Sequence, residues 1–378
     1  MQINHQRLTR EFLAQAAIAS PARREGAMCA YLKERFRVLG GDVKEDASMK
    51  DTGSECGNLL VRFPGTRSGE PILLAVHMDT VEPADGVEPF LEGEVVRSRG
   101  ETILGADDKA GIVEIIEALE VLHENDIAYP PLEVLITVCE EIGLVGAKHF
   151  DCTQLEARRG IALDTAGIDV CIHRAPAANR LYVEIIGKES HAGMAPEKGI
   201  SAIEVAAHAI AEMRLGRIDE ETTANVGLVE GGQAINIVPR LVRIEGETRS
   251  HDLGKLAAQT DHMLTCFEQA GQKYARHIDG HLYAPQVVSR VEEDYPRMFV
   301  PESSRIVALL REATKGLGHQ LEVRAAGGGS DANILNGRGV ETVIIGTGMQ
   351  DVHTVNEQVA VEDMAHVANL LVSVLSRA

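Results

Sequence analysis

Apolar, β-rich runs recur in the first and last parts of the chain and alternate with segments of helical periodicity. The runs cover residues 71–79, 132–141, 160–165 and 340–348. Between the first two, residues 109–125 place apolar side chains at helical spacing, namely Ile112, Ile115, Ile116, Leu119 and Leu122. Strands that are apolar throughout and alternate with helices indicate an α/β domain with a mainly parallel sheet covered on both sides.

The middle of the chain has a different rhythm. It predicts strands at 180–188, 222–230, 240–249 and near 284–294, with helices at about 200–215 and 252–270. The order β-α-β-β-α-β is typical of a small α+β ferredoxin-like domain. Since β/α character resumes afterwards and ends with a predicted helix at 361–377, we expect this domain to be inserted into the larger one. The expected boundaries are 1–176 and 297–378 for the larger domain and 177–296 for the insertion.

Acidic and histidine side chains stand where the apolar runs end. They are His77, Asp79, Glu140, Glu141 and Asp164, with His353 in the loop after the last run, and a further pair, Asp107 and Asp108, stands at the start of the long predicted helix. Parallel strands place their carboxyl ends at one edge of a sheet, where sites form in the loops. We expect Glu140 and Glu141 to occupy the end of the 132–141 strand and to point to different partners, because neighbouring strand residues face opposite ways.

So many carboxylates at one edge would repel each other unless a cation neutralised them. Histidine and carboxylate ligands without sulfur suit Zn²⁺, with Mn²⁺ or Co²⁺ as alternatives. The supply matches two metal ions that share a bridging carboxylate and take two further protein ligands each. The six cysteines are widely spaced and lack a CxxC motif, so we interpret them as reduced core thiols.

Charge and composition exclude several classes of protein. With 57 acidic against 37 basic residues, a net charge of −20 and no Trp, the chain is not expected to bind nucleic acid. It has no apolar stretch near the eighteen residues of a membrane span and no apolar core in its first twenty residues. We therefore expect a cytoplasmic protein that does not associate with membranes.

Five motifs occur in an order that resembles a known family. HMDT, GADDKAG, EEIGLVGA, LDT and a late histidine, with a small domain inserted after LDT, are similar to the dinuclear zinc metallopeptidases that include peptidase T, glutamate carboxypeptidase and aminoacylase. GADDKAG is most similar to the peptidase T branch. The resemblance implies a zinc-exopeptidase-like catalytic domain, two Zn²⁺ ions, and a homodimer formed through an inserted lid and dimerisation domain.

The resemblance also implies a role for each motif residue. Asp107 would bridge the metals, His77 and Asp164 would complete one site, and Glu141 and His353 the other. Asp79 would orient the imidazole of His77. Glu140 would be the general base that takes a proton from the metal-bridged water. Family members have a cis peptide bond after the bridging aspartate, which falls at Asp107–Asp108.

Further candidates come from the insertion and from a glycine-rich loop. By resemblance, His191 in ESHAGMAPEKG would reach the active site of the neighbouring subunit and stabilise the oxyanion. Asn236 and Arg249 would bind the substrate backbone or carboxylate. Gly328, in the loop 324–339, would let backbone N–H groups approach a ligand closely.

These features predict a zinc-dependent exopeptidase that hydrolyses short peptides, of the tripeptide aminopeptidase kind. One alternative uses the same mechanism on N-acyl amino acids or other acylated amines. A remote alternative is a non-catalytic metal-binding protein on the same fold, which would be expected to have lost the base, whereas Glu140 is present.

Overall fold

The computed structural model describes residues 3–378 and divides the chain into two compact units, each with its own apolar core. Of the described residues, the first unit comprises 3–174, 298–326 and 330–378, and the second comprises 175–297 and 327–329. The second unit is thus an insertion in the first, apart from the three glycines Gly327–Gly329.

A mixed sheet forms the centre of the first unit. In spatial order its strands are β1 (Asp42–Glu45), β2 (Leu59–Phe63), β6 (Leu132–Thr137), β3 (Ile72–His77), β7 (Arg159–Thr165), β18 (Glu341–Gly346), β8 (Val170–Ala175) and β16 (Met298–Phe299), with β17 (Glu322–Ala325) paired to β8. The central pairs β6–β3, β3–β7 and β7–β18 are parallel, whereas β1–β2, β2–β6 and β18–β8 are antiparallel. Every residue of β3 and β6 is buried, as expected for strands covered on both faces.

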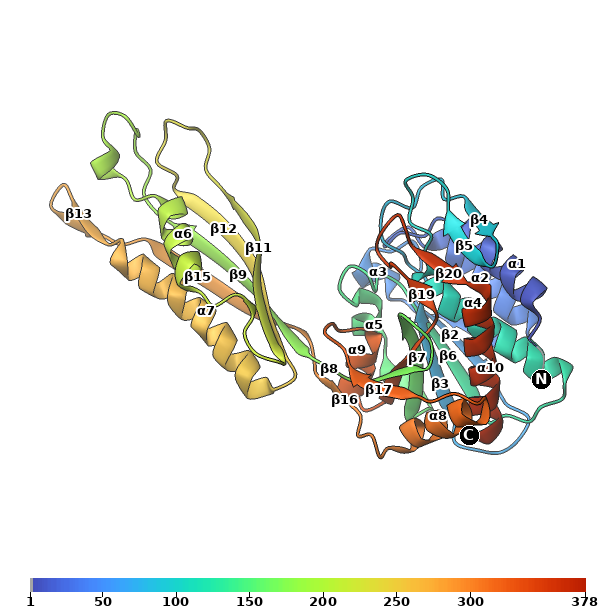
Figure 1. Ribbon diagram of the computed structural model, residues 1–378. Helices are drawn as coiled ribbons and strands as arrows, with labels where there is room; N and C mark the ends of the chain where they lie inside the picture. Colours follow the sequence, from blue (N-terminus) through green and yellow to red (C-terminus); the bar gives the residue numbers. More distant parts are fainter. Residues whose placement is uncertain (1–2) are drawn as a thin grey trace. The chain divides into compact units, whose positions relative to one another are not determined.

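Helices cover both faces of this sheet. They are α1 (His5–Ala16), α2 (Gly26–Val38), α3 (Met49–Thr52), α4 (Ala106–Glu124), α5 (Val145–His149), α8 (Arg305–Gly316), α9 (Asp331–Gly337) and α10 (Val361–Arg377). Figure 1 shows α4 and α10 on one side of the sheet and α5 and α9 on the other. Helix α4 is buried nearly all round because it packs against β3, β7, α1 and α10 together. A small sheet of β4 (Pro89–Glu92), β5 (Val95–Ser98), β20 (Gln358–Ala360) and β19 (Met349–Gln350) completes the unit.

The second unit has the predicted ferredoxin-like order. Its elements are β9 (Ala177–Ile186), α6 (Ala202–Glu212), β10 (Gly216–Arg217), β11 (Thr222–Gly231), β12 (Leu241–Ser250), α7 (Leu253–Lys273), a hairpin of β13 (Arg276–Ile278) and β14 (His281–Tyr283), and β15 (Gln286–Tyr295). The sheet runs β10-β11-β12-β9-β15, and all its strand pairs are antiparallel. Helices α6 and α7 pack against each other and against this sheet (Figure 1).

One expectation about the strands is wrong. The apolar run 132–141 predicted a strand that carries Glu140 and Glu141, but β6 ends at Thr137 and both glutamates lie in a loop. The ladder stops because the amides of Val138 and Cys139 donate to the side chains of Asn58 and Glu25, and Cys139 adopts a left-handed φ of 54°. The directions of the two acids therefore follow from this turn and not from strand alternation.

Across residues 3–378, no helix has both the length and the apolar character needed to cross a bilayer. All six cysteines are free thiols, and five of them are buried. The cytoplasmic location expected from the sequence stays a prediction.

Candidate metal centre

Four neighbouring strands in the middle of the first unit carry the candidate ligands. His77 ends β3, Asp164 lies one residue before the end of β7, and Glu140 and Glu141 follow β6. His353 lies in the loop after β18 and β19. Because β6, β3, β7 and β18 run parallel to one another, these residues meet at one edge of the sheet, together with Asp107 at the start of α4.

Asp107 lies between the two histidines. Its Oδ1 is 3.0 Å from Nε2 of His77, and its Oδ2 is 3.3 Å from Nε2 of His353. Asp164 Oδ1 lies 3.8 Å from the same nitrogen of His77, and Glu141 Oε1 lies 3.1 Å from that of His353. Two groups of donors, His77–Asp107–Asp164 and Asp107–Glu141–His353, therefore share one carboxylate, which is the pattern required of a bridging ligand.

The backbone at Asp107 is unusual. The Asp107–Asp108 peptide bond is cis, as the family resemblance implied, and both residues have non-helical φ/ψ inside the segment assigned to α4. The carboxylate of Asp108 binds the backbone instead, because its Oδ2 accepts a hydrogen bond from the His77 amide at 3.2 Å. Only Asp107 of the two aspartates presents its carboxylate to both histidines.

The charges of this cluster call for a cation. Burial, and then the charge of Asp164, raises the pKa of Glu140 well above its ordinary value, and burial and Asp107 do the same for Asp164. Hydrogen bonds to Asp107 and Glu141 raise the pKa of His353 to about 10. Two like charges about 4 Å apart cost on the order of 4 kcal/mol at an effective dielectric of 20. In the absence of a cation, these raised pKa values mean that the cluster retains protons. A divalent transition-metal ion such as Zn²⁺, which binds imidazole nitrogen and carboxylate oxygen, can take the place of those protons.

Asp79 fixes the loop that carries the two glutamates. Its carboxylate is fully buried and accepts the amides of Glu140 at 2.9 Å and Glu141 at 3.1 Å. Glu25, also fully buried, accepts the amide of Cys139 at 3.0 Å. Two carboxylates thus hold three successive amides, which fixes the backbone from which both glutamate side chains project.

The same residue also defines the tautomer of His77. Nδ1 of His77 lies 2.9 Å from the backbone oxygen of Asp79 and 3.6 Å from its carboxylate. Since a carbonyl oxygen only accepts, the neutral ring carries its proton on Nδ1 and leaves the Nε2 lone pair facing Asp107 and Asp164. This is the tautomer that a metal ligand needs.

Glu357 is a residue of this site that the sequence did not reveal. Its buried carboxylate accepts the amides of Gly105 at 2.6 Å and Asp107 at 3.1 Å, and burial raises its pKa to about 7. It therefore holds the turn that presents Asp107, from 250 residues away in the chain. The only signal available in advance was its position four residues after His353.

The remaining candidates belong to the second unit. His191 is exposed, and its Nδ1 accepts the amides of Gly193 and Met194, each at 3.2 Å. The neutral ring therefore carries its proton on Nε2, which is left to donate. Asn236 lies beside it, because the Ala192 amide donates to the backbone oxygen of Asn236 at 2.9 Å.

Arg249 lies on β12 close to the glycine loop. Its guanidinium donates to Glu247 at 2.8 Å, while its buried Nε has no hydrogen-bond partner among residues 3–378. A Cβ on Gly328 would lie 3.7 Å from Nη1 of Arg249, and one on Gly329 would come within 2.5 Å of the Tyr295 ring. The loop thus passes directly over Arg249 and Tyr295, and Gly329 has no room for a side chain.

A family model described as peptidase family M20/M25/M40 matches residues 73–377. An uncharacterised protein, YqjE of Bacillus subtilis, is 41% identical over 377 residues, which span 100% of this chain and 99% of the relative. Peptidase T of Fusobacterium nucleatum is 26% identical over 78% of this chain and 70% of its own length.

Two solved structures match nearly the whole chain. The aminopeptidase PepT from Bacillus cereus has a TM-score of 0.89 and 40% identity, covering 99% of this chain and 98% of its own. A tripeptidase from Staphylococcus aureus has a TM-score of 0.93 and 36% identity, covering 100% of both chains.

Proposed function

Because this chain belongs to peptidase family M20/M25/M40, and is therefore a peptidase, we propose that it is a dinuclear metal-dependent aminopeptidase that acts on tripeptides and other short peptides. The observation that carries the proposal is the position of Asp107, whose two carboxylate oxygens face His77 and His353 separately. Similarity to an aminopeptidase and a tripeptidase supports the choice of substrate.

The proposed metals are two Zn²⁺ ions, for which Mn²⁺ or Co²⁺ can substitute. His77 and Asp164 would hold one ion, Glu141 and His353 the other, and Asp107 both. When bound, the pair would supply Lewis acidity that polarises the scissile carbonyl and acidifies water at neutral pH.

Glu140 is the proposed general base. It neighbours Glu141 in the loop fixed by Asp79, so its backbone is held by one of the same two hydrogen bonds. It takes a proton from the water whose oxygen attacks the scissile carbon. It then gives that proton to the peptide nitrogen as the C–N bond breaks, and the second proton of the water passes from the new carboxyl group to the amine, so the products are a carboxylate and an ammonium group.

His191 is proposed to act on the partner subunit of a homodimer. Its Nε2–H is the free donor of a fixed tautomer, which suits an oxyanion. An exposed strand in the same unit supports dimerisation: within the described part of the chain, residues 225–231 of β11 pair with β12 alone, and Leu228 and Val229 there are 55% and 53% exposed. Asn236 and Arg249 are proposed to bind the backbone and carboxylate of the peptide.

A substrate panel tests the proposed specificity. We expect the enzyme to cleave a tripeptide with a free N-terminus and to leave the same peptide intact when it is N-acetylated. An N-acetyl amino acid should also remain intact. Release of free amine, followed by chromatography of the products, is the measurement.

Cleavage of the acetylated compounds alone would replace the substrate class with acylated amines and keep the mechanism. Metal binding without cleavage of any compound would favour a non-catalytic protein and contradict the proposal.

Subunit mixing tests the role of His191. Glu140→Gln and His191→Ala subunits should each be inactive alone, because one lacks the base and the other the donor for its partner. After exchange at equal amounts, half of the dimers would be hybrids with one complete site each, so activity should recover to about a quarter of the wild-type value. Absence of recovery, with exchange verified by mass spectrometry, would show that His191 does not act across the dimer.

A further inference from the structure

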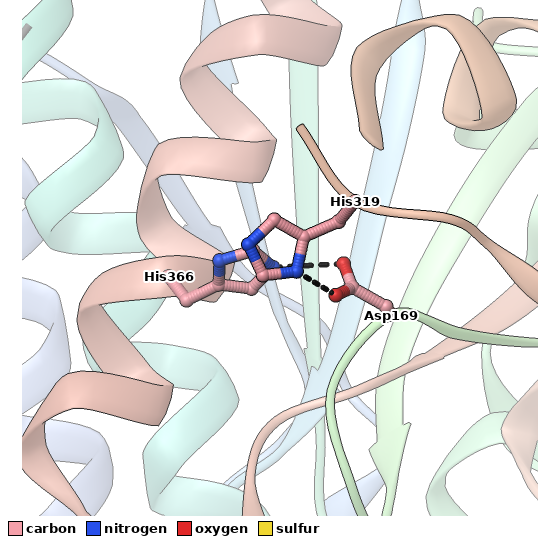
Figure 2. Close-up of side chains that lie close together, drawn as sticks. All are labelled: Asp169, His319 and His366. Carbon is pink, nitrogen blue, oxygen red and sulfur yellow. Dashed lines mark hydrogen bonds and ion pairs between the residues drawn. The ribbon is translucent and has the colours of Figure 1, made fainter. Parts of the chain in front are cut away.

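Three side chains outside the site described above meet in the first unit. Asp169 lies between β7 and β8, His319 between α8 and β17, and His366 on α10. Figure 2 shows both imidazole rings turned toward the one carboxylate. Asp169 Oδ2 is 2.7 Å from Nδ1 of His319, Oδ1 is 2.7 Å from Nε2 of His366, and the ring centroids are 4.4 Å apart.

The backbone holds these side chains in place independently of their mutual contact. Asp169 has a left-handed φ of 55°, and its carbonyl accepts the Glu322 amide at 2.8 Å. The His319 amide donates to Thr314 at 3.1 Å, at the end of α8. His366 is fixed as part of the long helix α10. A site assembled this way loses little conformational entropy when an ion binds.

The three donors match the chemistry of a transition-metal ion. One donor atom from each residue lies within 4.8 Å of the other two. Two imidazoles and one carboxylate suit Zn²⁺ and its neighbours in the first transition row, with open positions left for water. The His319 side chain is 45% exposed, against 14% for His366 and 13% for Asp169, so an ion could enter from solvent past His319.

The surroundings favour positive charge. Asp363 lies one turn before His366 on α10, where burial raises the pKa of its carboxyl and the proximity of His366 opposes that rise. A divalent ion bound by two neutral imidazoles and the carboxylate would leave one net positive charge beside Asp363. The ion would displace the protons on Nδ1 of His319 and Nε2 of His366, which lie between these rings and the Asp169 carboxylate.

We propose that Asp169, His319 and His366 form a third metal site that binds one divalent transition-metal ion, with Zn²⁺ as the preferred ion. Bound there, the ion would tie the β7–β8 loop and the α8–β17 loop to α10. The site shares no residue with the proposed catalytic pair, so its occupancy can be measured separately.

The experiment compares zinc bound by full-length, chelator-treated proteins after equilibrium dialysis against Zn²⁺. Relative to wild type, His319→Ala and Asp169→Asn should each bind about one equivalent less at the same free zinc concentration. Asparagine suits the left-handed φ of residue 169, and the His319 side chain is 45% exposed, so both variants are expected to fold. We expect the loss of affinity to exceed the roughly 10–100-fold that follows removal of a group hydrogen-bonded to a metal ligand.

His281→Ala is the matched control, because His281 is an exposed histidine on the β13–β14 hairpin, and it should bind as much zinc as wild type. Zinc contents that are the same in wild type, His319→Ala and Asp169→Asn would overturn the proposal.

A second measurement needs no substitution at the proposed third site. In Asp107→Asn protein labelled with ¹⁵N-histidine, addition of zinc should shift the NMR signals of the ring nitrogens of His319 and His366. Unchanged signals would show that zinc does not bind these histidines and would contradict the proposal, since the three residues would then form only a hydrogen-bonded cluster. Because that variant lacks the proposed bridging ligand, the result does not depend on the proposed peptidase mechanism.

Discussion

Replacing Glu140 with glutamine is expected to lower kcat by about 10²–10⁴-fold, the usual contribution of a positioned general base. Glutamine has nearly the same shape as glutamate but cannot accept a proton at neutral pH. The loop should keep its conformation, because Asp79 binds the backbone amides of residues 140 and 141 and not the side chain of Glu140. Steady-state kinetics on a free-amine tripeptide, together with metal analysis, measures the effect.

The control for this variant is Glu94→Gln, which makes the same chemical change on the exposed turn between β4 and β5. Glu94→Gln should retain wild-type kcat, and both variants should retain wild-type metal content. Unchanged turnover in Glu140→Gln would remove Glu140 from the role of base. Loss of metal from Glu140→Gln would instead indicate that Glu140 is a metal ligand.

Replacing Asp107 with asparagine is expected to remove both proposed catalytic ions, so metal content should fall by about two equivalents and activity with it. The reason is that each oxygen of Asp107 faces a different histidine, at 3.0 and 3.3 Å. Asparagine offers one oxygen and no charge. Asp164→Asn and His353→Ala each alter only one of the two donor groups, so each should lose about one equivalent.

Asp126→Asn is the matched control, since Asp126 is exposed and its φ of 51° is one that asparagine tolerates. It should bind as much metal as wild type. Retention of the full metal content by Asp107→Asn would contradict the bridging role. Equal losses in Asp107→Asn and Asp164→Asn would argue for a single ion.

The sequence was sufficient to predict the positions of those candidate residues that lie at the ends of parallel strands. His77 and Asp164 lie at or next to strand ends because apolar runs buried on both faces fix the strands and their direction, and a parallel sheet then brings those ends together. The strand–helix order of the insertion was readable for a similar reason, since its elements have clear periodicity. Asp107 could be singled out from Asp108 only through the family resemblance.

What the sequence did not reveal depends on hydrogen bonds between distant segments. Glu25 and Glu357 each hold a backbone turn of the site, yet each is an isolated acid in the sequence, with partners 114 and 250 residues away. The strand that was expected to reach Glu141 ends at Thr137 because side chains, not a neighbouring strand, take the next amides. Periodicity carries no information about such partners.

The place where the second unit is inserted has a consequence for how the protein can change over generations. The chain leaves the first unit at the end of β8 and returns at β16, and these two strands are neighbours in the sheet, with the Val300 amide donating to His173 at 2.8 Å. Exit and re-entry points this close make the insertion equivalent to a long loop between adjacent strands. Changes in the length or sequence of that module therefore need not alter the central strands or the residues of the candidate metal centre, all of which belong to the first unit.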